Sequence, residues 1–186
     1  MKERCPWCGD DPLYVKYHDE EWGKPCHDER TLFEMLILEG AQAGLSWITI
    51  LRKRDNYRKA FDNFDVGKIA RYTERDVERL MNDAGIVRNR LKINATITNA
   101  RAYLTLCEEV GGLDAYLWRY VDGVPLQPSL SSMATVPAST PLSDRISKDL
   151  KKRGFKFVGS TIIYAYMQAI GMTNDHIATC PQRGWA

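Results

Sequence analysis

Apolar residues recur at spacings of three and four along most of the chain, and no segment sustains an alternation of apolar and polar side chains. That spacing is typical of amphipathic helices, which complete a turn every 3.6 residues. The chain has 186 residues, enough to bury a substantial core in one large domain or two small lobes. The sequence therefore predicts an all-α fold of about eight to ten short helices.

Capping residues and glycines set the expected helix boundaries. The predicted helices run from Asp28 to Gly44, from Ser46 to Phe61, briefly after Asp65, from Thr73 to Gly85, from Arg88 to Val110, from Asp114 to Val121, from Thr140 to Gly154 and from Gly159 to Gly171. Residues 122–141 are rich in Pro, Ser and Thr and are predicted to form the one long loop. The tail, 172–186, is expected to be irregular apart from one turn around His176.

The formal net charge is only +2, so total charge does not indicate a nucleic-acid-binding protein. Lysines and arginines nevertheless cluster in residues 52–59, 88–92 and 148–156, and each cluster is equally well explained as a solvated helix face. No apolar stretch has membrane-spanning length, and the first residues lack the apolar core of a signal peptide. We therefore expect no membrane partner and a cytoplasmic, nucleoid-associated location.

Cysteines and histidines near the two ends of the chain suggest a metal site. The five cysteines are an odd number, which argues against a secreted disulfide framework. Two cysteines and two histidines suit a tetrahedral structural zinc ion that would join the two ends: Cys5, His18, His176 and Cys180. Cys8 and Cys26 remain rival ligands, since Cys5 and Cys8 form a C-x-x-C pair. On spacing alone, a metal site and a set of unliganded surface residues are equally favoured.

The first quarter of the chain combines aromatic residues with one carboxylate near the end of the strongest apolar helix: Tyr14, Tyr17, Trp22, Glu39 and Trp47. Aromatic faces and an acceptor would hold a flat, electron-poor base by stacking, by attraction to its charge and by hydrogen bonding to its edge. A buried carboxylate would be costly without a task. Spacing alone favours ordinary aromatic core packing.

A tight glycine turn between two predicted helices is followed by Arg88, Arg90 and Lys92, in the segment DAGIVRNRLK that starts at Asp83. Such a turn could present backbone N–H groups and positive charges to phosphates. An ordinary αα-hairpin is the alternative.

Five segments resemble the bacterial 3-methyladenine DNA glycosylase I family: YHDEEWG from Tyr17, LEGAQAGLSW from Leu38, DAGIVRNR from Asp83, KKRGFKFVGSTI from Lys151 and NDH from Asn174. They span nearly the whole chain, and the 122–141 loop is the least informative part. The resemblance implies a helix-hairpin-helix glycosylase architecture, in which residues 1–186 form a single domain of two helical lobes with a pocket between them.

The same resemblance implies roles for particular residues. It selects Cys5, His18, His176 and Cys180 as ligands of one structural zinc ion, with Cys8 and Cys26 extra to the pattern. It places the base pocket at Tyr17, Glu39 and Trp47, with Trp22 and Tyr14 as neighbours. It identifies residues 42–46, with Gly44 and Leu45, as the element that intrudes into DNA. It assigns Gly85, Arg88 and Arg90, within the hairpin Asp83–Arg90, to the DNA backbone.

The expected substrate decides the expected mechanism. Methylation at N3 makes the adenine cationic while it is still attached to the sugar, so the base departs neutral. Many helix-hairpin-helix glycosylases place an Asp after the hairpin, but this family lacks it and residues 86–91 contain no carboxylate. We therefore expect a monomeric, monofunctional glycosylase that flips out 3-methyladenine from double-stranded DNA and leaves an abasic site after water attacks C1′. Glu39 would accept a hydrogen bond from the base edge, Tyr17 would assist and Trp47 would stack.

Three other functions fit parts of the pattern. These are a zinc-stapled damage sensor without chemistry, a glycosylase with lyase activity, and a helical domain that binds protein or RNA. Glu39 among Tyr17 and Trp47 favours an enzyme over a sensor, because a groove binder has no use for a carboxylate that repels phosphate.

Overall fold

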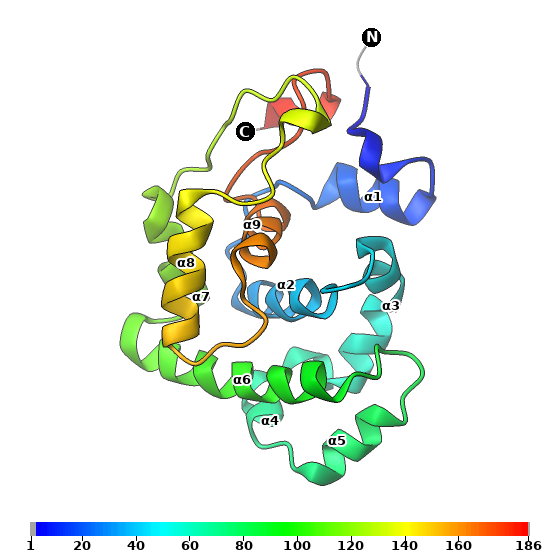
Figure 1. The fold of residues 1–186 in the computed structure, drawn as a ribbon, viewed down its shortest axis with the longest axis vertical. Helices are drawn as coiled ribbons and strands as arrows, with labels where there is room; N and C mark the ends of the chain where they lie inside the picture. The colour runs from blue at the N-terminus through cyan, green and yellow to red at the C-terminus, as the bar shows by residue number, and fades with distance from the viewer. Residues whose placement is uncertain (1–2, 186) are drawn as a thin grey trace.

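A computed structural model describes residues 3–185, which are helical and contain no β-strand, only an isolated bridge between Leu126 and Thr173 (Figure 1). The α-helices are α1 (Pro12–Glu20), α2 (Glu29–Ala41), α3 (Trp47–Ala60), α4 (Val66–Ala70), α5 (Glu74–Met81), α6 (Arg90–Val110), α7 (Leu113–Trp118), α8 (Pro141–Lys152) and α9 (Ser160–Ala169). Short 3-10 turns are η1 (Pro6–Cys8), η2 (Asp62–Phe64), η3 (Arg119–Val121), η4 (Met133–Thr135) and η5 (Pro181–Trp185). The all-α prediction is confirmed. Within the described residues, no helix has the length and apolar character needed to cross a membrane.

Helix α2 lies at the centre of the fold and contacts α3, α6, α7 and α9 (Figure 1). Every residue from Leu32 to Ala41 is buried, as expected for a helix that is apolar on nearly all sides. Its N-cap is the predicted Asp28, whose carboxylate accepts a hydrogen bond from the backbone N–H of Thr31 at 2.9 Å. The last buried turn of α2 therefore delivers Glu39 into the interior.

The helices predicted from Asp28 onward are present, with shifted ends. Helix α5 ends at Met81, ahead of Gly85, because Asn82 caps it, with its side-chain amide donating to the Glu78 carbonyl at 2.9 Å. Helix α6 begins at Arg90, and the Asn89 side chain accepts from the N–H of Lys92 at 3.1 Å, so Arg88 lies in the turn. The segment predicted as one helix from Asp114 to Val121 is divided between α7 and η3.

Helix α1 is absent from the sequence-based prediction. Asp11 caps it by accepting hydrogen bonds from the N–H groups of Leu13 and Tyr14, and Pro12 occupies the first helical position. An Asp-Pro pair is a recognised start signal, since proline lacks the N–H that a first turn leaves unpaired. This helix matters for the site because it carries Tyr14, Tyr17 and His18.

The two ends of the described chain lie side by side, with Glu3 N–H donating to the Thr179 carbonyl at 3.2 Å (Figure 1). The long 122–141 loop also docks on the C-terminal segment. Leu126 bonds Met172 and Asn174 through its backbone, and the Ala178 N–H donates to the Leu130 carbonyl at 2.8 Å. The loop is therefore held in place by the tail.

Candidate functional site

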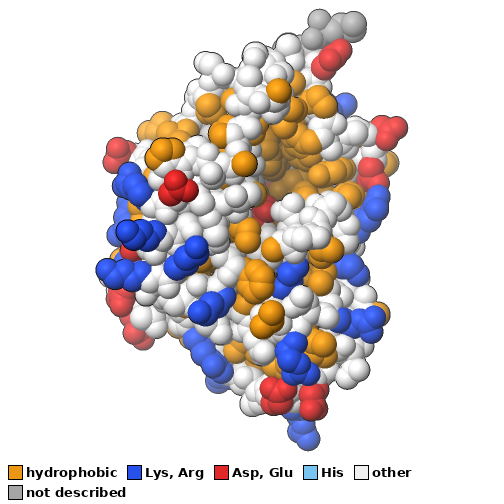
Figure 2. Space-filling model, viewed as in Figure 1, with side chains coloured by type: hydrophobic (Ala, Val, Ile, Leu, Met, Phe, Trp, Pro, Cys, Tyr) orange, Lys and Arg blue, Asp and Glu red, His pale blue; other side chains and the backbone are white. Residues whose placement is uncertain are grey.

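An open cavity of about 800 Å³, including its mouth, lies between α1, the end of α2, the start of α3 and α9. All five predicted base-binding side chains border it: Tyr14, Tyr17, Trp22, Glu39 and Trp47. Figure 2 shows a hollow lined by hydrophobic side chains in the upper part of the molecule. The fold thus brings together residues that are far from contiguous in the sequence.

The cavity also contains residues that the sequence analysis did not single out. Trp7 of η1 packs edge-on against Tyr14 and Trp22, with ring centroids 5.0 and 4.9 Å away. Trp7 lies between Cys5 and Cys8 in the C-x-x-C segment, where the sequence pattern predicts a metal site and not a pocket residue. Met133 and Val136 of the 122–141 loop form part of the wall, and Tyr164 and Gln168 enter from α9. The long loop therefore borders the pocket.

Unpaired polar atoms converge on this cavity. Among the described residues, the enclosed side-chain atoms without a hydrogen-bond partner are Trp7 Nε1, Tyr17 OH, Glu39 Oε2 and Trp47 Nε1. All four belong to residues that border the cavity. Buried polar groups in folded proteins are nearly always hydrogen-bonded, so a set of orphans in one cavity points to a polar ligand.

The protonation of Glu39 depends on what occupies the cavity. Its side chain is 4% exposed, and burial raises its pKa to about 8, with no cation nearby to offset this. Burial therefore favours the protonated form of this carboxyl group. A cationic ligand or a strong hydrogen-bond donor would favour the carboxylate.

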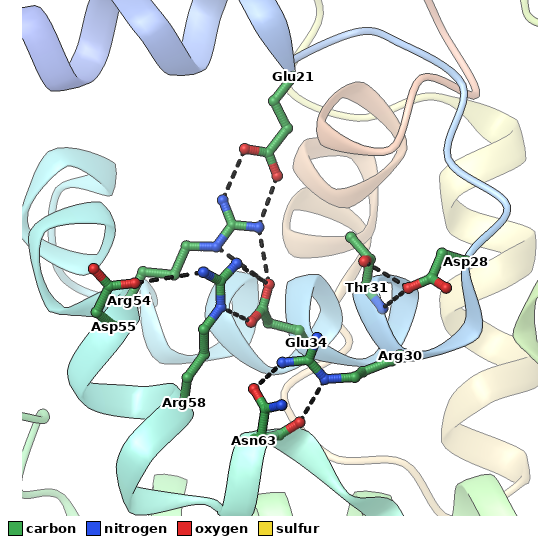
Figure 3. Close-up of polar contacts among 9 residues, drawn as sticks. All are labelled: Glu21, Asp28, Arg30, Thr31, Glu34, Arg54, Asp55, Arg58 and Asn63. Carbon is green, nitrogen blue, oxygen red and sulfur yellow. Dashed lines mark hydrogen bonds and ion pairs between the residues drawn. The ribbon is translucent and has the colours of Figure 1, made fainter.

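One buried guanidinium joins the three helices that carry Tyr17, Glu39 and Trp47 (Figure 3). Arg54 of α3 donates to both carboxylate oxygens of Glu21, directly after α1, at 2.8 and 2.7 Å, and to Glu34 of α2 at 2.8 Å. Arg58 also binds Glu34. The network fixes the relative positions of α1, α2 and α3 behind the cavity.

The loop between α2 and α3 presents Leu45, which is 42% exposed, beside the cavity residue Gln42. Gly44 has φ of 80°, a left-handed conformation that glycine adopts without strain. The Lys92 ammonium donates to the carbonyls of Ala41 and Ala43, at 2.8 and 2.5 Å, and so ties this loop to α6. Two of the three Lys92 donors are therefore used within the protein, and its proposed contact with phosphate stays a prediction.

The turn between α5 and α6 contains the predicted backbone-contact residues. The Gly85 N–H donates to the Asp83 carboxylate at 2.8 Å, and Arg90 pairs with Glu74 at 2.8 Å. Arg88 is exposed and makes no ion pair with any described residue. Arg88 is thus the member of this set whose charge is uncommitted.

A second cluster brings the two ends of the chain together. One ligand atom from each of Cys5, His18, His176 and Cys180 lies within 4.8 Å of the others, and all four residues are buried. Cys180 Sγ lies 3.5 Å from both His18 Nε2 and His176 Nδ1, and Cys5 Sγ lies 3.7 Å from His176 Nδ1. Tetrahedral zinc bonds of about 2.0 Å to nitrogen and 2.3 Å to sulfur place the two atoms about 3.5 Å apart. The donor set therefore fits such an ion.

The opposite ring nitrogens of the two histidines are also engaged. His18 Nδ1 lies 2.7 Å from the Asp19 carboxylate, and His176 Nε2 lies 2.9 Å from the Trp22 carbonyl. Partners of this kind orient metal-binding imidazoles. Cys8 donates to the Cys5 carbonyl, and Cys26 borders a separate hollow, so neither rival belongs to the cluster.

Comparisons with known proteins show similarity in sequence and in overall fold. Residues 7–183 match the family model described as methyladenine glycosylase. The chain is 53% identical over 178 residues to DNA-3-methyladenine glycosylase 1 of Escherichia coli (strain K12), covering 96% of this chain and 95% of the relative. It is similar to a crystal structure of 3-methyladenine DNA glycosylase I, with a TM-score of 0.94, 54% identity, and coverage of 96% and 98%. A tyrosine-to-phenylalanine variant of 3-methyladenine DNA glycosylase I in complex with 3-methyladenine also has a TM-score of 0.94, at 37% identity, with 98% of both chains covered.

Proposed function

The chain belongs to the methyladenine glycosylase family, and on that basis we propose that it is a base-excision DNA repair enzyme that releases 3-methyladenine from double-stranded DNA. The reaction is monofunctional: water replaces the base at C1′ and an abasic site remains. The observation that carries the proposal is Glu39, an unpaired carboxyl group enclosed with aromatic rings in one cavity. Its pairing with a base edge would satisfy an otherwise costly buried group.

The cavity chemistry suits a flipped, positively charged base. Trp47 offers a ring face, and its centroid lies 5.5 Å from that of Tyr17. The ring quadrupoles attract the cation, and Glu39 accepts a hydrogen bond from the base edge with Tyr17 assisting. Positive charge on the base favours the ionised form of Glu39, so substrate entry and loss of the Glu39 proton reinforce each other. The described residues that border the cavity include no lysine, in line with hydrolysis without a Schiff base.

We place the DNA contacts on the face of the molecule that contains the cavity. Lysine and arginine side chains gather to the left of the hollow and below it (Figure 2). In this proposal α5, its turn and α6 act as the helix-hairpin-helix element, with Gly85, Arg88 and Arg90 at the backbone. The single chain 1–186 is a monomeric, two-lobed domain that acts in the cytoplasm on nucleoid DNA. Size-exclusion chromatography with light scattering tests the monomer.

Gly44 and Leu45 form the proposed wedge that fills the base stack when the nucleotide leaves. Leu45→Ala is expected to weaken binding to abasic duplex about tenfold, with little change for undamaged duplex, because only the former has a gap to fill. Fluorescence anisotropy measures both affinities. Leu104→Ala, at an equally exposed leucine on α6, is the control. Equal losses on both duplexes would remove the wedge from the proposal.

Cys5, His18, His176 and Cys180 would hold one zinc ion, whose role is structural: it joins the chain ends and takes no part in base release. We expect about one zinc per chain by elemental analysis. Cys180→Ser should lose the metal and much of the stability, whereas Cys8→Ser should retain both. The site would be contradicted if wild-type protein expressed with ample zinc contained no metal, or if Cys180→Ser were as stable as wild type.

The central experiment measures the bases released from methylated duplex DNA under single-turnover conditions. Wild-type protein should release 3-methyladenine, and Glu39→Gln should lower the rate about 10- to 100-fold, the range expected for losing a hydrogen bond to a charged group. Glu108→Gln, at an exposed glutamate of α6, is the matched control and should behave as wild type. A folded wild-type protein that binds damaged DNA but releases no base would indicate a damage sensor.

A further inference from the structure

Asp175 is a fully buried carboxylate beside the cavity that the proposed mechanism does not use. It lies in the segment between Met172 and the metal cluster. Its Oδ2 accepts hydrogen bonds from the Tyr164 hydroxyl and from Gln168 Nε2, the latter at 2.9 Å, and its Oδ1 accepts from the Thr173 hydroxyl at 2.7 Å. Tyr164 and Gln168 both border the base cavity, and Thr173 does not. Asp175 thus holds two residues of the cavity wall from behind.

The carboxylate decides which end of the Gln168 amide faces the cavity. A side-chain amide has one donor end and one acceptor end, and Asp175 already accepts from the hydroxyl groups of Tyr164 and Thr173. In the structure the NH₂ group of Gln168 points to Asp175 and donates to its Oδ2 at 2.9 Å. No described residue donates to Oε1 of Gln168, and this atom is not among the enclosed orphans. Gln168 borders the cavity, so we infer that this open acceptor is available to a ligand there.

We propose that Gln168 is a specificity-determining residue whose carbonyl oxygen accepts a hydrogen bond from the exocyclic amino group of the flipped base, and that Asp175 is the positioning residue that holds it in this orientation. The inference deepens the proposed function and depends on it. A 6-amino group carries two N–H donors, which Glu39 of α2 and Gln168 of α9 would share from different helices. The contact between α2 and α9 brings these two elements together.

In this proposal the cavity discriminates between purines by the substituent at position 6. A 6-oxo purine would present a carbonyl oxygen to the Gln168 oxygen, so two acceptors would face each other without a proton. A site built to pair a donor rejects an analogue that lacks it strongly, since its own polar group is left unpaired. Alkylated guanines, which are 6-oxo purines, would be disfavoured for this reason in addition to their shape.

The test compares two free bases, 3-methyladenine and 3-methylhypoxanthine, by calorimetry with the zinc-loaded full chain. They differ in the group at position 6 and in the N1 proton that the 6-oxo form carries. Wild-type protein should prefer 3-methyladenine by about tenfold or more. Gln168→Met retains similar volume without an acceptor, and should reduce the preference severalfold, because it weakens 3-methyladenine and removes the acceptor that opposes the 6-oxo group of 3-methylhypoxanthine. The part of the preference that depends on Glu39 should remain. Asp175→Asn can donate to Oε1 and let the amide turn over, so it should weaken 3-methyladenine and strengthen 3-methylhypoxanthine.

Thr173→Val is the matched control, since it removes a hydrogen bond to Asp175 without touching the cavity, and its preference should equal that of wild type. A variant that merely loosens the fold would weaken both bases together, so the ratio separates recognition from stability. If Asp175→Asn does not fold, Gln168→Met decides alone. An unchanged ratio in Gln168→Met overturns this inference while leaving excision of 3-methyladenine by wild type intact. Absence of that excision would instead contradict the proposed function.

Discussion

Two glutamates on the same helix, five positions apart, are buried to nearly the same degree and have opposite surroundings. Glu34 is 2% exposed and receives hydrogen bonds from both Arg54 and Arg58 (Figure 3), whereas Glu39 is 4% exposed and its Oε2 has no partner. Burial alone would raise the pKa of Glu34, but the Arg58 hydrogen bonds and the Arg54 charge lower it below its usual value. At Glu39 burial acts unopposed and raises the pKa to about 8.

The contrast separates a structural carboxylate from a functional one. The interactions of Glu34 are complete within the protein, so it stabilises the contact between α2 and α3. Those of Glu39 are incomplete, so its free energy falls only when a ligand supplies the missing partner. The same residue type on one helix therefore serves two purposes, and burial does not distinguish them. The partners do.

Glu34→Ala should produce the largest change in stability. It removes the main partner of Arg58 and leaves Arg54 with Glu21 alone. Breaking a buried ion pair costs about 3–5 kcal/mol, and because Arg54 keeps one partner and Arg58 is partly exposed, we expect a loss near the lower end, about 3 kcal/mol of unfolding free energy. Urea denaturation at pH 7 measures it, with Glu108→Ala expected within about 0.5 kcal/mol of wild type. A loss of unfolding free energy below about 1 kcal/mol would contradict the structural role that we assign to Glu34.

Glu39→Gln should change stability in the opposite sense at high pH. The carboxyl group binds its proton more tightly in the folded protein, so its contribution is present below the unfolded pKa of about 4.5 and is lost as the pH rises to about 8. Glutamine does not titrate, so the variant should be more stable than wild type by about 2–4 kcal/mol at pH 9 and should differ little at pH 4. Thermal unfolding across this range measures the difference, and parallel curves would contradict it.

Two tyrosines extend the comparison at smaller magnitude. The Tyr166 hydroxyl donates to the Leu32 carbonyl at 2.7 Å, whereas the Tyr17 hydroxyl has no partner. Tyr166→Phe should therefore cost about 1–2 kcal/mol, and Tyr17→Phe should leave stability unchanged or slightly higher while slowing excision. Equal losses of stability in chemical denaturation would show that the Tyr17 hydroxyl already has a partner in the folded protein.

The sequence predicted most helices because their signals are local. Asp28 caps α2, and the glycines at 111 and 112 follow the end of α6 as expected. Helix α1 was missed although Asp11 and Pro12 carry a start signal, because its aromatic and histidine residues do not form a clear apolar face. The candidate site was anticipated where residues matched the family, whereas Trp7, Gln168 and Asp175 were not.

The sequence by itself determined the helical class, the chemistry available and the family, because periodicity, capping and residue type are properties of neighbouring positions. Spacing left the choice of cysteines open and the family resemblance selected Cys5 and Cys180, which the structure brings to His18 and His176. Only the tertiary structure decided that the long loop borders the cavity, and that Glu39 lacks a partner while Glu34 has two. These outcomes depend on contacts between residues far apart in the chain. A hydrogen bond is present or absent only once both partners have been placed, so no local pattern could reveal the atoms that remain unpaired.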